Sequence, residues 1–184
     1  MSRVSVQQHD FDPGVELSAL TDGRTDIGAA VSFVGLVRDI HGGESVSALT
    51  LDHYPGMTER ELEKIADEAA ARWPLDEIRI VHRFGRMLPG ERIVLVIVLS
   101  AHRRAAFEAC DFIMDFLKTR APFWKREETP DGGDKWVTAK ASDDADADRC
   151  GQLRGGAVKT RVTHDRGRVV DHRVDPAELL KQEG

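Results

Sequence analysis

Four cations and no acid stand in a short segment of this chain, residues 118–126, which reads Lys-Thr-Arg-Ala-Pro-Phe-Trp-Lys-Arg. The whole chain of 184 residues has a formal net charge of -6, so this basic segment does not follow from the average composition. Lysine and arginine donate charge-assisted hydrogen bonds to phosphates and carboxylates. The segment therefore predicts an anion-binding site, in which Lys118 or Lys125 could also take part in chemistry.

A simpler interpretation of Lys118 stays open beside this one. Asp111, Asp115 and Lys118 follow one another at spacings of four and three residues. On a helix, such spacings give an ordinary surface ion pair worth about 0.2–0.5 kcal/mol. A solvated helix face, however, does not normally include two large aromatics such as Phe123 and Trp124. The aromatic residues favour a binding site over a plain charged surface.

Other cations are expected at the ends of predicted strands. His102 and Arg103 follow an apolar strand and begin a helix, where free backbone N–H groups and the helix dipole favour anions. Arg38 ends another predicted strand, shortly before Gly42 and Gly43. An ordinary loop charge is the alternative interpretation of Arg38. Together these positions are candidate ligands for the same anion.

The remaining candidate residues indicate neither a metal site nor a redox site. His53 and His82 lie in strand patterns and have no partner at the spacing of metal ligands. Cys110 falls in an apolar helical pattern and Cys150 in a polar segment, and neither belongs to a Cys-x-x-Cys pair. For the acidic residues 143–148, a solvated linker is favoured over a metal site. We therefore expect no metal and no cofactor.

Alternating strands and helices are predicted around these positions. Strands are predicted over residues 4–7, 29–37, 46–54, 77–84 and 92–100, with short extended pieces around Trp124 and Trp136. Helices are predicted over residues 13–20, 57–73 and 103–117. Asp12 is the expected N-cap of the first helix, and Thr58 with Glu61 fits a capping box for the second. The expected inner face of the third consists of Phe107, Cys110, Ile113, Met114 and Leu117.

The length of the chain predicts one sizeable domain, which we place at residues 1–140. Residues 141–184 are expected to form an acidic linker and a C-terminal extension, with a hairpin over 158–174 and a short helix over 176–182. The longest apolar run, residues 93–99, is far shorter than the roughly 18 residues that a membrane helix needs. The N-terminus lacks the apolar core of a signal peptide. A cytoplasmic protein without a membrane partner is the expectation.

Several stretches of the chain match one protein family. They are residues 31–38, 51–57, 100–103, 112–115 and, most specifically, 117–127, which reads Leu-Lys-Thr-Arg-Ala-Pro-Phe-Trp-Lys-Arg-Glu. In these motifs the chain resembles the large, catalytic subunit of molybdopterin synthase, the MoaE family. The resemblance spans residues 4–140.

The resemblance implies a fold, a reaction and partners. The fold is α+β, of the α/β-hammerhead type, with a mainly antiparallel sheet and helices packed on it. The reaction converts cyclic pyranopterin monophosphate (precursor Z) to molybdopterin by building a dithiolene. The sulfur comes from a small ubiquitin-like sulfur-carrier subunit that ends in a Gly-Gly thiocarboxylate, and the large subunit forms a homodimer within a heterotetramer. Because the chain has no convincing sulfur-carrying cysteine, an outside sulfur donor agrees with its composition.

The resemblance also implies the site residues. Lys118 is the principal catalytic residue, an amine for proton transfer or for attack on a carbonyl. Lys125 is the second catalytic lysine, which stabilises developing negative charge or holds the phosphate. The implied substrate-binding residues are Arg38, His102, Arg103, Phe33, Met114 and Lys140. At position 140 the family often has an arginine from the other protomer; a lysine keeps the charge and loses the bidentate geometry.

A different class of function is the alternative. Cations with interleaved aromatics also fit a non-catalytic protein that binds a pterin, another anion or single-stranded nucleic acid. Nucleic-acid-binding domains usually present a broad basic surface, whereas this chain has a net charge of -6. We therefore expect the enzyme and no nucleic-acid partner.

Overall fold

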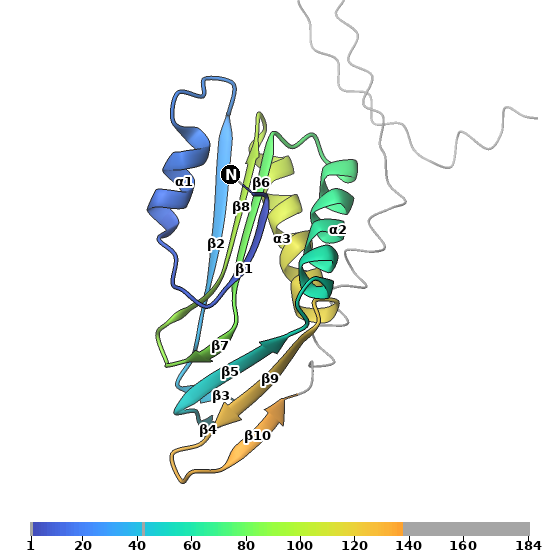
Figure 1. The fold of residues 1–184 in the computed structure, drawn as a ribbon. Helices are drawn as coiled ribbons and strands as arrows, with labels where there is room; N and C mark the ends of the chain where they lie inside the picture. The colour runs from blue at the N-terminus through green and yellow to red at the C-terminus, as the bar shows by residue number, and fades with distance from the viewer. Residues whose placement is uncertain (1, 42, 138–184) are drawn as a thin grey trace, which may run out of the picture. The chain divides into compact units, whose positions relative to one another are not determined.

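The first sheet is built around two central strands whose side chains are mostly buried. The computed structural model describes residues 2–41 and 43–137, and its elements are drawn in Figure 1. The order of the strands is β1 (Val4–Gln7), β6 (Glu77–Arg83), β8 (Arg92–Ser100) and β2 (Ala29–Leu36). β8 pairs antiparallel with both β6 and β2, while β1 adds to β6 in parallel. This order leaves β2 at one edge of the sheet.

Helices cover both faces of the first sheet (Figure 1). α2 (Met57–Arg72) and α3 (Arg103–Thr119) pack on one face, over a core of aliphatic side chains and Phe112. α1 (Pro13–Thr21) contributes to a second cluster on the other face. Asp12 caps α1 as predicted, because its carboxylate accepts two backbone N–H groups of the first turn.

The start of α2 differs from the prediction. Gly56 is the N-cap, with a φ of 77° that favours glycine, and the carboxylate of Glu59 accepts the Gly56 N–H at 2.6 Å. The predicted capping box of Thr58 and Glu61 is therefore wrong by two residues. The Thr58 hydroxyl instead accepts the N–H of Tyr54 at 3.2 Å. A buried hydroxyl that bonds to the preceding turn was indistinguishable in the sequence from a helix cap.

The inner face of α3 is confirmed except at one position. The buried members of the predicted set are Cys110, Ile113 and Leu117, and Met114 is half-buried. Phe107, in contrast, is 62% exposed. Ala106 and Ala109 face the sheet in this part of the helix, and Phe107 lies about 100° around the axis from Ala106. The small alanines, rather than the large aromatic, occupy the contact with the sheet.

A second sheet lies below the first in Figure 1. Its strand order is β10 (Asp134–Val137), β9 (Phe123–Glu128), β5 (Ala48–His53) and β7 (Gly85–Met87), all paired antiparallel. β3 (Ile40–His41) and β4 (Glu44–Ser45) form a separate two-stranded ladder. The sequence predicted no strand at β7, which lies within a connection only a few residues long. The two sheets and their helices confirm the predicted α+β fold with mainly antiparallel pairing.

Several sequence predictions concern residues outside the described ranges. They are the extension 141–184 with its hairpin and helix, and the substrate-binding role of Lys140. The domain boundary near residue 140 therefore stays a prediction. Within the described ranges, no helix is both long enough and apolar enough to cross a membrane.

Candidate active site

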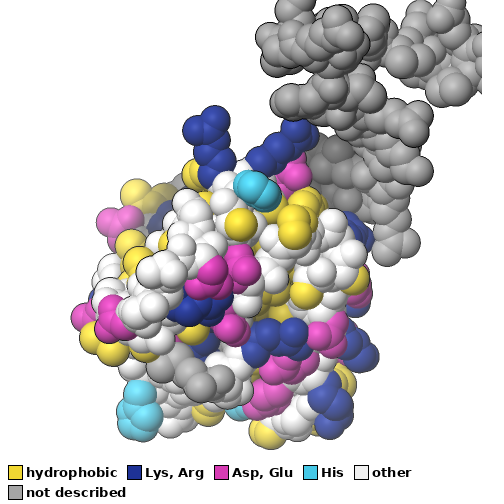
Figure 2. Space-filling view, turned by 90° about the horizontal axis from the view of Figure 1, so that it is seen from above, with side chains coloured by type: hydrophobic (Ala, Val, Ile, Leu, Met, Phe, Trp, Pro, Cys, Tyr) yellow, Lys and Arg dark blue, Asp and Glu magenta, His cyan; other side chains and the backbone are white. Residues whose placement is uncertain are grey.

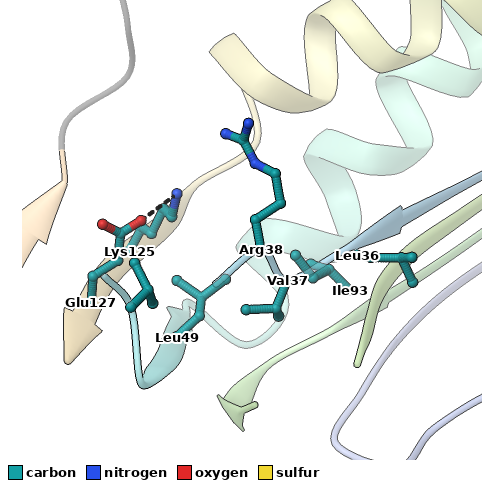
Figure 3. Close-up of a pocket in the computed structure, with 8 residues that line it drawn as sticks. Leu36, Val37, Arg38, Leu49, Ile93, Lys125 and Glu127 are labelled. Carbon is teal, nitrogen blue, oxygen red and sulfur yellow. Dashed lines mark ion pairs between the residues drawn. The ribbon is translucent and has the colours of Figure 1, made fainter. Parts of the chain in front are cut away.

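A pocket of about 170 Å³ lies where the end of β2 meets β5 and β9 (Figure 3). The residues that line it are Leu36, Val37, Arg38, Val46, Leu49, Ile93, Lys125 and Glu127. Five of these eight residues are aliphatic, and the charged groups are two cations and one carboxylate. The two cations can donate charge-assisted hydrogen bonds to an anionic group, and the aliphatic side chains offer an apolar contact beside them.

Lys125 and Glu127 form the charged side of the pocket on β9. Successive side chains of a strand point to opposite faces, so residues two apart share a face. The Lys125 Nζ lies 2.9 Å from Glu127 Oε1, and the Glu127 side chain is only 9% exposed against 35% for Lys125. A buried carboxylate therefore holds the ammonium at the pocket. Glu127 was not among the predicted site residues, although its spacing from Lys125 within a predicted strand was the signal that could have found it.

The basic segment does not act as one cluster of cations. Arg120 pairs with Glu68 of α2 at 2.9 Å, and Arg126 pairs with Asp134 of β10 at 2.7 Å. Neither arginine lines the pocket. Of the cations in the segment, Lys125 alone is a pocket-lining residue.

Arg38 reaches the pocket from the end of β2. The register of β2 with β8 shifts between Gly35 and Leu36, and such an irregularity redirects the following side chains. Arg38 is exposed, and within the described ranges no acid pairs with it. Figure 3 shows its guanidinium and the Lys125 amine on the same side of the pocket. The structure therefore brings two of the predicted anion ligands, Arg38 and Lys125, to one pocket.

Lys118 lies outside the pocket lining, in the last turn of α3. Its side chain is exposed, and the C-terminal end of a helix favours a cation there. The Arg120 N–H donates to the Phe116 carbonyl at 2.8 Å and closes the helix. The chain then turns through residues 120–122 into β9, which carries Lys125. The two lysines thus stand on either side of one short connection.

His102 and Arg103 lie at the opposite end of α3 from Lys118. Both are exposed, and the His102 side chain makes no capping hydrogen bond. At 1.5 Å per residue, Arg103 and Lys118 are separated by about 22 Å along the helix axis. Within one chain the structure therefore does not bring His102 and Arg103 to the pocket that holds Lys125.

The two predicted lining residues are also outside the pocket. Phe33 is 40% exposed on the edge strand β2, and Met114 packs half-buried against the core below α3. Both lie on the side of the first sheet where α3 packs on β2.

Cys110, His53 and His82, which the sequence also singled out, do not line the pocket. Burial raises the pKa of the Cys110 thiol to about 11, so a thiolate is disfavoured at neutral pH. His53 and His82 are packed against aromatic rings. In the described part of the chain, no three His, Cys, Asp or Glu side chains are grouped so as to hold a metal ion.

Comparisons with known proteins agree on one family. The model of the MoaE protein family matches residues 6–120. The chain is 57% identical over 146 residues to the molybdopterin synthase catalytic subunit of Pseudomonas aeruginosa, covering 79% of this chain and 97% of that one. It is 53% identical over 148 residues to the subunit of the same name from Escherichia coli, covering 80% and 97%.

Solved structures give the same result. The fold superimposes on the molybdopterin biosynthesis MoaE protein of Burkholderia ambifaria with a TM-score of 0.70 and 51% identity, over 82% of this chain and 99% of that one. For the molybdopterin synthase of Staphylococcus aureus the TM-score is 0.68 at 30% identity, over 75% and 98%. The family model, the relatives and the solved structures agree, and the chain belongs to the MoaE protein family.

Proposed function

We propose that this chain is the catalytic subunit of a molybdopterin synthase and acts as a sulfurtransferase. It takes sulfur from the C-terminal thiocarboxylate of a small ubiquitin-like carrier and builds the dithiolene on cyclic pyranopterin monophosphate. The observation that carries the proposal is the pocket in which Arg38 and Lys125 stand against apolar walls. The names of relatives more than 50% identical over nearly their full length support the same activity.

The cations of the site have distinct tasks in this proposal. Arg38 presents a planar fork of donors that suits a phosphate. Lys125, held by Glu127, supplies a positive charge where negative charge develops during sulfur transfer. Lys118, across the short connection, provides an amine for proton transfer or for attack on a carbonyl.

The apolar wall of the pocket suits the sulfur donor. Leu36, Val37 and Ile93 line one side, and Leu36 is 52% exposed. A Gly-Gly tail has no side chains, so it can pass along such a wall in a pocket of about 170 Å³. The small carrier is therefore expected to present its C-terminus from the side where Leu36 reaches the surface.

A second copy of the chain can supply the residues that one chain leaves far apart. At 100° per residue, Arg103, Phe107, Met114 and Lys118 fall within about 60° on one face of α3. The exposed Phe107 on this stripe and the exposed Phe33 on the edge strand β2 form an apolar surface beside it. Such a surface suits an isologous, two-fold contact.

The symmetry of that contact has a consequence for the site. If two α3 helices pack antiparallel about their midpoints, near residue 110, then Arg103 of one copy lies beside Lys118 of the other. His102 comes with it, because it directly precedes α3. Each site of the homodimer then takes Lys118 and Lys125 from one copy and His102 and Arg103 from the other.

The surface charge supports this proposal over a nucleic-acid binder. Figure 2 shows acidic and basic side chains interspersed on the face that it displays. A protein that tracks a phosphate backbone usually presents a continuous basic groove.

The test is reconstitution with a thiocarboxylated small subunit and precursor Z. The unmutated chain is expected to form the dithiolene product, and Lys118→Ala is expected to abolish it while thermal unfolding and binding of the small subunit stay unchanged. Lys64→Ala, an exposed lysine on α2, is the matched control. Full activity of Lys118→Ala would remove the catalytic role, and a formed complex without product would favour an inactive binding protein.

Mixing two inactive variants tests the shared site. Heterodimers of Lys118→Ala and Arg103→Ala contain one site with both residues intact, so random mixing is expected to restore about a quarter of the activity. If both residues served the same copy, no heterodimer would contain an intact site. Absence of any recovery in demonstrably mixed dimers would contradict the proposed arrangement.

A further inference from the structure

The connection between the two lysines passes through a single aromatic anchor, Phe123. Lys118 lies in the last turn of α3, and Lys125 follows Phe123 by two residues in β9. The Phe123 N–H donates to the Ala121 carbonyl at 2.8 Å, so the chain turns tightly here. Because the connection is short, Phe123 fixes the path of the chain between the two lysines.

Phe123 is held by a ring from the other sheet. The His82 ring stacks on the Phe123 ring with centroids 3.9 Å apart and planes at 18°. His82 belongs to β6 of the first sheet, whereas Phe123 begins β9 of the second. On β5, the residue that pairs with Phe123 is His53, whose own ring lies 4.2 Å from Phe84. The stack therefore joins the two sheets directly below the turn between the lysines.

The His82 ring is itself fixed in orientation. Its Nδ1 lies 2.9 Å from the Arg83 carbonyl, which can only accept, so Nδ1 carries the proton. The Arg83 side chain is anchored in turn, because it donates to the carbonyls of Gln8 at 3.1 Å and Arg92 at 2.9 Å. Burial lowers the pKa of His82 to about 4, and His53 adds to this effect. At neutral pH the ring is uncharged and packs as a flat aromatic group with one oriented donor.

We propose that His82 is a positioning residue for the reaction, which acts by holding Phe123 and with it the connection between Lys118 and Lys125. This inference rests on the proposed function, in which both lysines take part. His82 does not line the pocket, and its role requires neither contact with the substrate nor transfer of a proton. A shift of reacting groups by about 1 Å can slow an enzyme by about a hundredfold. A loosened Phe123 should therefore reduce turnover more than substrate binding.

Three variants separate positioning from general stability. His82→Leu keeps an apolar side chain but removes the flat ring, and His82→Phe restores a ring without the Nδ1 donor. Val81→Ala, at the preceding position of β6, is the matched control, because Val81 is fully buried in the core cluster on the α1 face of the sheet. In the reconstituted complex, His82→Leu is expected to lower kcat at least about tenfold with KM for precursor Z within about twofold. His82→Phe should recover most of that loss, and Val81→Ala should keep the kcat of the unmutated chain despite a lower melting temperature.

A second measurement does not depend on catalysis. Hydrogen exchange of the backbone amides of residues 120–126 should become faster in His82→Leu, and should stay close to that of the unmutated chain in His82→Phe and Val81→Ala. If His82 acts through Phe123, the double variant His82→Leu/Phe123→Leu should lose no more kcat than Phe123→Leu alone.

The outcomes discriminate between the explanations. Unchanged kcat and exchange in folded His82→Leu would overturn the proposal, and so would equal losses of kcat in His82→Leu and Val81→Ala. Fully additive effects in the double variant would also contradict it. If the unmutated chain forms no product, the proposed function fails, and the exchange measurement alone then decides whether His82 positions the connection.

Discussion

The two sheets of this protein are stabilised in different ways. In the first sheet, the last seven residues of β8 are all buried, and six of them are aliphatic. In the second sheet, β9 carries four charged residues in six positions. Their ion pairs are Lys125 with Glu127, Arg126 with Asp134, and Glu128 with Arg86. Burial of apolar surface predominates in the first sheet, beside the buried pair of Arg79 with Glu16, whereas the second sheet adds its ion pairs to a small apolar cluster on β5 and β7.

This difference explains where the candidate site lies. Arg38 follows β2 of the first sheet, and Lys125 belongs to β9 of the second, so the pocket forms at the junction of the two. The buried sheet gives a rigid base, because close-packed interiors tolerate little movement. The ion-paired sheet can present a cation without burying it. Experiments that separate catalysis, burial and ion pairing therefore test the contrast directly.

The largest effect is expected on catalysis, in a comparison of two adjacent residues of β9. Lys125→Ala should reduce dithiolene formation by about 10²–10⁴-fold, because the amine at the pocket is lost. Arg126→Ala should stay within about twofold of the unmutated chain, because Arg126 pairs with Asp134 and does not line the pocket. Single-turnover measurements on the reconstituted complex give both values. Equal losses of activity in the two variants would show that catalysis depends on the total positive charge of β9, and not on the face of the strand that carries it.

The sequence predicted the buried sheet better than the ion-paired one. The predicted strand over residues 92–100 matches β8. A continuous apolar run of this length between turn residues is typical of a buried strand. The strand β7 was missed, because its three residues obtain their stability from pairing with β5 and not from a local pattern. Phe107 was misplaced because hydrophobicity alone cannot show which side of a helix meets the sheet.

The site was predictable in its residue types but not in its assembly. The basic segment and Arg38 were recognisable from the sequence, and the pocket contains Arg38 and Lys125. The pairing of Arg120 with Glu68 was not recognisable, because it joins the C-cap of α3 to α2, and the two residues are distant in sequence. The distance of Arg103 from Lys118 follows from the length of one helix, and it could have been read from the predicted boundaries. Whether a second copy supplies Arg103 depends on an interface, which no local pattern encodes.

The next effect, on stability, concerns the buried sheet and its dependence on pH. The folded-state pKa of His82 is about 4, below the ordinary value of 6.5, because burial disfavours the charged ring. The unfolded chain therefore binds a proton near pH 6.5 that the folded chain does not bind until about pH 4. Acidification through this window should lower the free energy of unfolding by about 3 kcal/mol, while above pH 6.5 this contribution is constant.

His82→Phe removes the titrating group and keeps a ring at the same position. Urea unfolding of both proteins at several pH values between 7 and 4 measures the difference, in which the other titrating groups cancel. The gap between the two stability curves should change steadily as the pH falls. Parallel curves would mean that water or a protein group stabilises the charged ring, and that the first sheet is less dry at His82 than its burial indicates.

The smallest effect is expected in the ion-paired sheet. The Arg86 guanidinium donates to both carboxylate oxygens of Glu128, through Nε at 3.0 Å and 3.1 Å and through Nη2 at 2.8 Å. The pair connects the edge strand β7 to β9 across β5, but Arg86 is more than half exposed, so water and salt screen it. Arg86→Gln should lower the melting temperature by a few degrees at most, and less in 1 M NaCl than in 0.05 M. Arg24→Gln, whose pair with Asp26 spans two residues of one loop, should change it less still. A large loss in Arg86→Gln that persists in high salt would show that packing of the arginine stem, and not paired charge, holds β7 to the second sheet.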